Sequence, residues 1–409
     1  MSKTVEEICA HVDRHRNGAI ELLKALVCVP SDNPPGDCAP HAEATAALFE
    51  AMGLAVERHP VPQELVQRHG MISATNLIVR HRFGDGPILA LNAHGDVVPP
   101  GSGWSTDPYG GEIRDGWLYG RGAAVSKSDI ASYAWALKAL IDTRVALGGT
   151  VELHITYDEE IGGHTGPEHI LSAGLSSPDF AICAAFSYAV VTAHNGCLHL
   201  EVQVKGRSAH AAMPDSGHDA IRAAARVIDA VYAYSETLRD RPSAFVGVEH
   251  PTCVVGLVSG GINTNVVADS ATIRIDRRIT PDENAGEVEE ELRNLLETSV
   301  EGMPGITIHC ERILLALPFT PVEGSDRLAA VVADHASRII GEPIGEVALP
   351  LFTDARHYSE AGIPTVMYGA GPKSLLDANG HRADERVPLE TLATASKIIA
   401  CTAAELLAI

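Results

Sequence analysis

The sequence lacks the features of several classes of protein. Its 409 residues carry a formal net charge of −22, and the acidic residues are spread along the chain without a long acidic block. Nucleic acids and anionic membranes both attract basic surfaces, so we expect neither a nucleic-acid partner nor a membrane partner. No apolar run approaches the length that spans a bilayer.

The cysteines also exclude two kinds of site. No two of them form a C-x-x-C pair, so neither a zinc ribbon nor a thioredoxin-like motif is indicated. In a chain of this length they are expected to be buried free thiols in a reducing compartment. The first residues lack an apolar signal core, and we therefore expect a cytoplasmic protein. The eight cysteines are Cys9, Cys28, Cys38, Cys183, Cys197, Cys253, Cys310 and Cys401.

Hydrophobic residues make up 45% of the chain, which is enough to bury a large core. A chain of this length is expected to form about two or three domains. Before residue 195 the patterns alternate between strands and helices, which favours a mostly parallel sheet flanked by helices. Strands are expected near 54–60, 75–82, 87–94 and 150–157, helices near 6–25 and 127–143, and a further helix that follows the turn at 33–37 and ends near 52. The predicted class is α/β.

The pattern changes near residue 196 and changes back near residue 314. The order between them is β-α-β-β-α-β, the ferredoxin-like or split-βαβ arrangement, with helices at 220–238 and 284–296. Its strands are expected near 198–204, 253–259, 265–277 and 306–312. We therefore predict a discontinuous α/β domain, residues 1–195 and 314–409, with an α+β domain inserted at residues 196–313. In the last segment we expect a helix near 325–340, a strand near 364–369 and a helix near 389–407.

One expected strand ends in chemistry-bearing residues. The apolar run from Leu89 leads into His94 and Asp96, which are two residues apart and so project from the same face. Ligands collect at the carboxyl ends of strands in α/β sheets. A metal ligand oriented by a neighbouring carboxylate fits this pair, although a lone histidine there is more often structural.

Further motifs follow in a fixed order along the chain. Together they resemble the co-catalytic zinc family that contains acetylornithine deacetylase, succinyl-diaminopimelate desuccinylase, aminoacylase and glutamate carboxypeptidase. The resemblance implies a zinc-exopeptidase-like fold whose inserted domain is a lid and dimerisation module. The motifs are Ala93–Asp96, Gly120–Ala123, Asp158–Gly163, Gly206–His210, Gly260–Val267, Thr353–Arg356 and His381–Glu385.

The resemblance implies roles for individual residues. In that family two zinc ions are bridged by an aspartate and a water. His94 would bind one metal and be oriented by Asp96, while Glu160 and His381 would bind the other. Glu159 would be the general base that deprotonates the bridging water.

It also implies residues on the substrate side. His210 would reach over the site of the partner subunit in a homodimer and stabilise the oxyanion. Asn265, Arg278 and Arg356 would grip a carboxylate or the backbone of a small-molecule substrate, and an arginine fork matches a carboxylate with two hydrogen bonds.

Two expected ligands are missing. The bridging aspartate should occupy position 125, which is Val125, and a second acidic ligand should fall at about Ala185. A catalytic zinc usually keeps three protein ligands and a water. With His94 alone on one side and Glu160 and His381 on the other, we expect no dinuclear site.

Three interpretations remain open. In the first, one zinc, cobalt or manganese ion remains and an amide bond of a small N-acyl amino acid or dipeptide-like substrate is hydrolysed. In the second, no metal is bound and Glu159 carries out acid–base chemistry, as in a racemase, lyase or hydrolase, on a small amino-acid derivative. In the third, the chain only binds a small molecule.

Two neighbours of the missing ligands have alternative roles. Lys127 either fills the charge gap left by a cation or is simply exposed in the first turn of its helix. Cys183 either replaces the lost ligand or points into the core from its strand.

Overall fold

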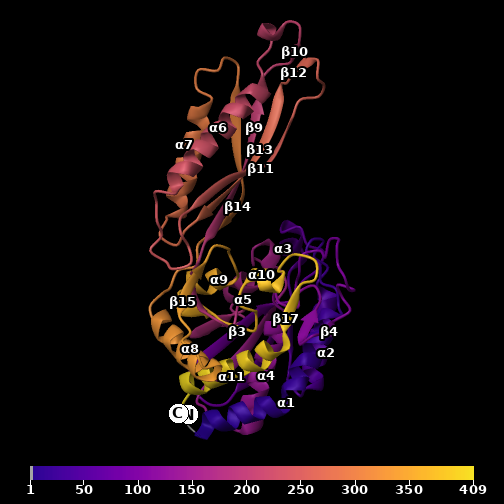
Figure 1. The fold of residues 1–409 in the computed structure, drawn as a ribbon, viewed down its shortest axis with the longest axis vertical. Helices are drawn as coiled ribbons and strands as arrows, with labels where there is room; N and C mark the ends of the chain where they lie inside the picture. The colour runs from indigo at the N-terminus through magenta and orange to yellow at the C-terminus, as the bar shows by residue number, and fades with distance from the viewer. Residues whose placement is uncertain (1–2) are drawn as a thin grey trace. The chain divides into compact units, whose positions relative to one another are not determined.

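The computed structural model describes residues 3–409, which divide into two compact units. The first unit comprises the residues up to Thr192 together with Pro321–Val347 and Thr353–Ile409. The second comprises Ala193–Thr320 and Ala348–Phe352, and the predicted inserted segment 196–313 lies within it (Figure 1).

The first unit is built on an eight-stranded sheet in the order β1-β2-β6-β3-β7-β16-β8-β15. The neighbours β6, β3, β7 and β16 are parallel, whereas β1 and β2 pair antiparallel on one side and β8 pairs antiparallel with β16 on the other. The prediction of an α/β fold with a mostly parallel central sheet is confirmed. The strands are β1 (Glu57–Pro60), β2 (Thr75–Arg82), β3 (Ile88–His94), β6 (Thr150–Thr156), β7 (Phe180–Cys183), β8 (Val190–His194), β15 (Glu346–Leu349) and β16 (Thr365–Met367).

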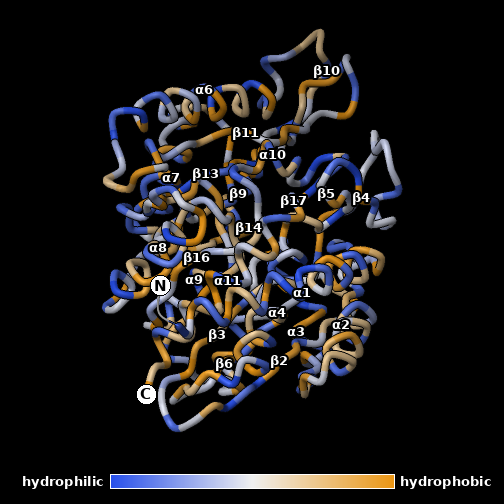
Figure 2. The backbone as a smooth tube through the Cα atoms, turned by 60° about the horizontal axis from the view of Figure 1, so that its bottom comes forward, coloured by the Kyte–Doolittle hydropathy of each residue, from blue (hydrophilic) through white to orange (hydrophobic). Residues whose placement is uncertain are grey.

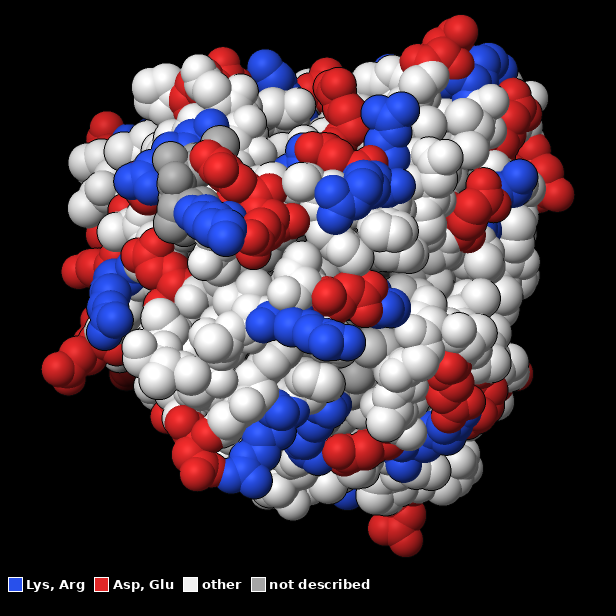
Figure 3. Space-filling model, turned by 90° about the horizontal axis from the view of Figure 1, so that it is seen from below, with Lys and Arg blue, Asp and Glu red and all other residues white. Residues whose placement is uncertain are grey.

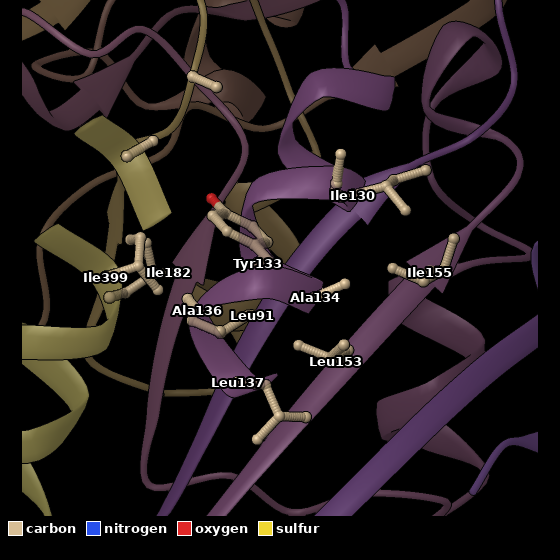
Figure 4. Packing of buried hydrophobic residues seen from close by; sticks show 14 of the residues in the cluster. Leu91, Ile130, Tyr133, Ala134, Ala136, Leu137, Leu153, Ile155, Ile182 and Ile399 are labelled. Atoms are coloured by element: carbon tan, nitrogen blue, oxygen red, sulfur yellow. The ribbon is translucent and has the colours of Figure 1, made fainter. Parts of the chain in front are cut away.

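Both faces of this sheet are covered, which is why β3 and β6 are buried along almost their whole length. On one face Leu91 and Leu153 belong to the core cluster that contains Ile130 and Leu137 of α4 (Figure 4). On the other face His154 Nδ1 of β6 lies 2.8 Å from the hydroxyl of Tyr358 in α9 (Ala355–Glu360). The first face is packed by α1 (Lys3–Val27), α4 (Lys127–Thr143), α8 (Ser325–Ile340) and α11 (Leu389–Leu406).

Shorter elements complete the first unit. A three-stranded sheet in the order β17-β5-β4 joins the long loop after β3 to the segment that precedes α11. The elements are α2 (Ala39–Ala51), α3 (Gln63–Arg68), β4 (Glu112–Arg114), β5 (Trp117–Tyr119), a 3₁₀ turn η1 (Glu159–Ile161), α5 (Pro167–Ser172), α10 (Leu375–Ala378) and β17 (Arg386–Pro388).

The second unit has the predicted split-βαβ order. Its four-stranded antiparallel sheet runs β11-β13-β9-β14, and α6 and α7 lie together on one face of it (Figure 1). Leucine and valine side chains of β9 alternate toward these helices and form the core of the unit. The elements are β9 (Gly196–Lys205), β10 (Ala209–His210), η2 (Pro214–Ser216), α6 (Ala220–Leu238), β11 (Thr252–Gly260), β12 (Val266–Val267), β13 (Ser270–Ile279), α7 (Ala285–Ser299) and β14 (Thr307–Ala316).

The outer helices and the surface carry hydrophilic and charged residues, as expected for the outside of a folded chain. The tubes of the outer helices alternate between hydrophobic and hydrophilic residues in Figure 2, as expected for helices with one buried face. The face drawn in Figure 3 carries acidic and basic side chains interspersed. Among the described residues 3–409, every helix is too short or too polar to cross a membrane.

Candidate active site

The candidate site is formed where the parallel strands of the first unit end. His94, the last residue of β3, is paired with Thr156, the last residue of β6, and Asn92 is paired with Cys183 at the end of β7. The turn that carries Glu159 follows β6 directly. Because these strands are parallel, the residues after them meet at one edge of the sheet, where α/β proteins bind ligands.

Asp96 connects the two strand ends. Its side chain is fully buried and accepts hydrogen bonds from the backbone N–H groups of Glu159 and Glu160, both at 3.3 Å, and from Asn33 Nδ2 at 3.0 Å. His94 Nδ1 lies 3.3 Å from Asp96 Oδ1 and 3.0 Å from the Asp96 carbonyl oxygen. These two oxygen atoms of Asp96 can hold a proton on His94 Nδ1, so the other ring nitrogen, Nε2, points away from Asp96.

The predicted site residues of the first unit converge. Ligand atoms of His94, Glu159 and Glu160 all lie within 4.8 Å of one another, and His94 Nε2 is 3.9 Å from Glu159 Oε2. His381 Nε2 lies 3.3 Å from Glu160 Oε1. The structure therefore brings the four side chains together from three segments that are far apart in the sequence.

The charges of these groups are strongly coupled. Burial raises the pKa of the Glu159 carboxyl well above its usual range, although the neighbouring His94 acts in the opposite direction. Burial by itself lowers the pKa of His94, but Glu159 and Asp96 outweigh it and raise that pKa well above its usual value. The hydrogen bond to Glu160 raises the pKa of His381.

The segment that carries His381 is firmly held. His381 has a φ of +62°, in the left-handed region that residues other than glycine rarely adopt. Nearby, Glu385 forms a fully buried ion pair with Arg121, in which the Arg121 Nη1 to Glu385 Oε2 distance is 2.6 Å. A side chain fixed in an unfavourable backbone conformation is typical of functional sites.

Val125 lies in the loop whose next residue, Ser126, contacts the backbone of His94, and its side chain brings no ligand atom. Its backbone N–H donates to Glu385 Oε1 at 3.1 Å, and the hydroxyl of the next residue, Ser126, donates to the His94 carbonyl oxygen at 3.1 Å. The loop is therefore fixed against the end of β3 with a valine side chain where the resemblance places a bridging carboxylate.

The other non-ligating position, Ala185, has a buried carboxyl group near it that the sequence reasoning missed. A side chain at Gly369 would collide with both Asp129 Oδ1 and the carbonyl oxygen of Ala185, so these two groups flank the same small space. Asp129 Oδ1 accepts a hydrogen bond from Ala370 N at 2.6 Å, whereas Oδ2 is buried and has no hydrogen-bond partner among residues 3–409. Burial raises the pKa of Asp129 to about 8.

Asp354 is a second buried acid that the sequence reasoning did not assign. Its Oδ2 accepts a hydrogen bond from Thr156 Oγ1 at 3.3 Å. Burial raises the pKa of Asp354 to about 7, with His94 and Asp96 among its electrostatic neighbours. The motif Thr353–Arg356 is the signal that could have drawn attention to it, but its burial is not visible in the sequence.

Arg356 is buried and engaged. Its Nη2 donates to the carbonyl oxygen of Gly162, at the end of the Glu159 turn, and Nη1 lies 3.5 Å from Glu360 Oε1. The guanidinium thus supports the turn that carries Glu159. Its predicted contact with a substrate carboxylate stays a prediction.

One of the two interpretations of Lys127, an exposed position in the first turn of its helix, is wrong, whereas the charge-gap interpretation stays a prediction. The side chain is fully buried, and Nζ donates to the carbonyl oxygens of Leu26 at 3.2 Å and Val29 at 3.0 Å. Burial lowers the pKa of this amine to about 7. Lys127 therefore ties α4 to the end of α1 and is not an exposed residue, and the nearby carboxylates of Glu385 and Asp96 act against burial to raise its pKa.

The remaining predicted residues belong to the second unit. His210 is exposed on β10, and its Nδ1 accepts a hydrogen bond from Ala212 N at 3.0 Å. Asn265 is exposed, and its carbonyl oxygen accepts a hydrogen bond from Ala211 N. Arg278 donates two hydrogen bonds to Asp276.

The donor set of the first unit fits a divalent cation. His94, Glu159 and Glu160 offer one imidazole and two carboxylates within a small buried space, and His381 is adjacent to Glu160. Imidazole and carboxylate are ligands that zinc and related divalent ions accept. The buried acids Asp96 and Asp354 add negative charge that a cation would offset.

Comparison with known proteins gives a consistent result. Residues 90–405 match Peptidase family M20/M25/M40. A succinyl-diaminopimelate desuccinylase of Wolinella succinogenes is 29% identical over 386 residues, which cover 90% of this chain and 94% of that protein. An acetylornithine deacetylase of Myxococcus xanthus is 28% identical over 361 residues, covering 87% and 88%.

A solved structure supports the fold. The YXEP protein of Bacillus subtilis, described as a dinuclear metal-binding peptidase from the M20 family, matches with a TM-score of 0.69 and 19% identity. The match covers 97% of this chain and 99% of that one.

Proposed function

Because the chain belongs to peptidase family M20/M25/M40, we propose that it hydrolyses the amide bond of a small N-acyl amino acid or dipeptide-like substrate. Two relatives that match nearly their whole length are named desuccinylase and deacetylase. The observation that carries the proposal is the convergence of His94, Glu159 and Glu160 at the carboxyl edge of the sheet.

We further propose that this site holds one divalent cation, zinc, cobalt or manganese, through His94, Glu160 and His381. Such an ion polarises a carbonyl group and makes water a better nucleophile at neutral pH. A matched pair of ions is not expected, because Val125 cannot bridge them and Ala185 cannot complete the half-site of His94.

The protein groups then have distinct tasks. Glu159 accepts the proton of the attacking water and returns it to the leaving amine, as a carboxylate whose pKa is raised by burial can do. Asp96 holds the His94 ring by Nδ1 and, through the backbone N–H groups of Glu159 and Glu160, fixes the adjacent turn. Arg356 supports the far end of that turn.

The substrate contacts remain part of the proposal. We expect the substrate to bear a carboxylate, with His210 stabilising the oxyanion and Asn265, Arg278 and Arg356 available for the carboxylate. We also propose that the second unit acts as a lid and dimerisation module in a cytoplasmic homodimer, as the family resemblance implies.

The proposal is tested by two neighbouring substitutions. Glu159→Gln cannot accept a proton, so we expect turnover of the best N-acyl amino acid substrate to fall by about 10²–10⁴-fold with the cation content of the site unchanged. Glu160→Gln removes a ligand, so we expect the cation content to fall together with the activity. Elemental analysis and an amine-release assay, after loading with zinc, cobalt or manganese, measure the two effects.

Other results would point to the other two interpretations. Equal turnover by cation-free and cation-loaded protein, still abolished by Glu159→Gln, would establish metal-independent acid–base chemistry. Binding of acyl amino acids without turnover under any loading would leave a binding protein.

A further inference from the structure

The second unit contains a separate group of metal-ligand side chains. Cys197 and His199 lie on β9, and Asp276 on β13 is paired directly with His199. Side chains alternate along a strand, so Cys197 and His199 share one face of the sheet, and their cross-strand neighbour Asp276 shares it too. The intervening Leu198 packs into the core on the opposite face.

The ligand atoms of these three residues are close to one another. Cys197 Sγ lies 3.1 Å from His199 Nε2 and 3.7 Å from Asp276 Oδ1, and His199 Nε2 lies 3.1 Å from Asp276 Oδ2. Ligands of a tetrahedral zinc ion, at bond lengths of about 2.0–2.3 Å, lie roughly 3.3–3.6 Å apart. Shifts of a few tenths of an ångström would therefore place all three around one ion.

The cluster is accessible from one side. Cys197 is fully buried, whereas the side chains of His199 and Asp276 are 35% and 26% exposed. An ion held by the three residues would therefore have a fourth position open to water. The proposed amide hydrolysis assigns no role to any of them.

We propose that Cys197, His199 and Asp276 form a binding site for one thiophilic divalent cation, with zinc as the best fit. A thiolate, an imidazole and a carboxylate are all zinc ligands, and the thiolate favours zinc over magnesium or calcium. The site would join β9 to β13 near the point where the chain enters the second unit.

Arg278 fits this arrangement as a residue that orients the carboxylate. Its Nε donates to Asp276 Oδ1 at 3.0 Å and its Nη2 to Asp276 Oδ2 at 3.2 Å. Each carboxylate oxygen can accept more than one bond, so these contacts leave room for a metal bond. Hydrogen-bonded partners of this kind commonly orient metal ligands.

Cobalt titration of the metal-depleted full-length chain tests the proposal. The ligand set proposed for the first site, His94, Glu160 and His381, contains no thiolate, so a thiolate-to-cobalt charge-transfer band in the near ultraviolet would report a cysteine ligand outside that set. We expect this band in the wild-type protein and its loss in Cys197→Ser. We also expect the wild-type protein to bind one more zinc equivalent than Cys197→Ser.

Three further variants complete the test. Cys310→Ser changes a cysteine of the same sheet whose side chain packs toward the helices, and it should keep the band. Cys183→Ser, at the end of β7 in the first unit, should keep it as well. If Cys197→Ser does not fold, as judged by circular dichroism, His199→Gln should weaken cobalt binding about tenfold or more.

The proposal is overturned if the wild-type protein shows no charge-transfer band or if the band survives in Cys197→Ser. Where Cys197→Ser does not fold, the proposal is overturned if His199→Gln binds cobalt as tightly as the wild-type protein. It is also overturned if the band disappears in Cys183→Ser. None of these results tests the general base of the proposed amide hydrolysis, which the Glu159→Gln variant tests separately in the first unit.

Discussion

At the scale of single residues, the proposed one-cation chemistry of the first unit depends on two positions. Val125 and Ala185 stand where a bridging and a terminal carboxylate would complete a dinuclear site. Around them the structure keeps His94, Glu159 and Glu160 within 4.8 Å of one another. On the proposed assignment, the site keeps its base and part of its ligand set while it lacks the groups that would hold a second ion.

Restoring these carboxylates should restore a second ion. We expect Val125→Asp combined with Ala185→Glu to raise the cation content of the first unit from about one equivalent to about two, since a bridge and a complete half-site then exist. Elemental analysis measures the bound cation, and both double variants are made in a Cys197→Ser background so that the proposed site of the second unit does not contribute. The isosteric pair Val125→Asn and Ala185→Gln, which brings no charge, should stay at about one equivalent, and equal contents in the two double variants would contradict the prediction.

Asp129 provides a prediction about pH. Burial raises its pKa to about 8, whereas an aspartate in an unfolded chain titrates near 4. Between these values the folded protein holds a proton that the unfolded chain has released, so this group lowers the free energy of unfolding as pH rises from about 4 to 8. Asp129→Asn should therefore be increasingly more stable than wild type over that range, by up to about 1.4 kcal/mol per pH unit.

Urea unfolding at several pH values in the presence of a chelator measures this difference. Asp326→Asn, a change of an exposed aspartate in the first turn of α8, should run parallel to the wild type. A constant offset between Asp129→Asn and wild type from pH 5 to 8.5 would show that Asp129 is ionised throughout.

At the scale of elements, a buried ion pair fixes two loops of the site together. Arg121 and Glu385 are each 1% exposed, and Glu385 also accepts hydrogen bonds from the backbone N–H groups of Ala124 and Val125. This pair connects the loop after β5 to the segment that carries His381. The pair is thus expected to determine where His381 lies relative to Glu160.

Breaking the pair should be costly. Arg121→Met leaves the Glu385 carboxylate buried and unpaired, and we expect it to lower the free energy of unfolding by about 3–5 kcal/mol. Lys138→Met removes a partly exposed ion pair with Asp142 on α4 and should cost about 0.5 kcal/mol or less. Urea unfolding measures the free energy of unfolding of both variants. A similarly small decrease in both would contradict the prediction and would mean that Glu385 binds another partner or a proton at little cost.

The long elements were predictable from sequence, and the short ones were not. The predicted helix 127–143 and the predicted strand near 75–82 coincide with α4 and β2, because long runs carry a stronger signal than short ones. The expected strand 265–277 is in fact two, β12 and β13, because residues 266–267 pair with β10 while β13 pairs with β9. The three-residue strands β4, β5 and β17 depend on pairing between distant segments and have no local pattern.

At the scale of the whole molecule, the site is a consequence of parallel topology. Residues after β3, β6 and β7 meet at one edge because those strands run in the same direction, and this could be anticipated from the alternating strand–helix pattern. Burial could not be anticipated. Lys127 and Asp129 begin a helix that looks solvent-exposed in sequence, yet tertiary packing encloses both.

The central claim, that this edge holds one cation and not a pair, is tested most directly by anomalous scattering from crystals of the cation-loaded protein. The account predicts a single strong peak in the first unit, in contact with His94, Glu160 and His381, and no second peak within about 3.5–4 Å of it. Two fully occupied peaks at that separation would contradict the account.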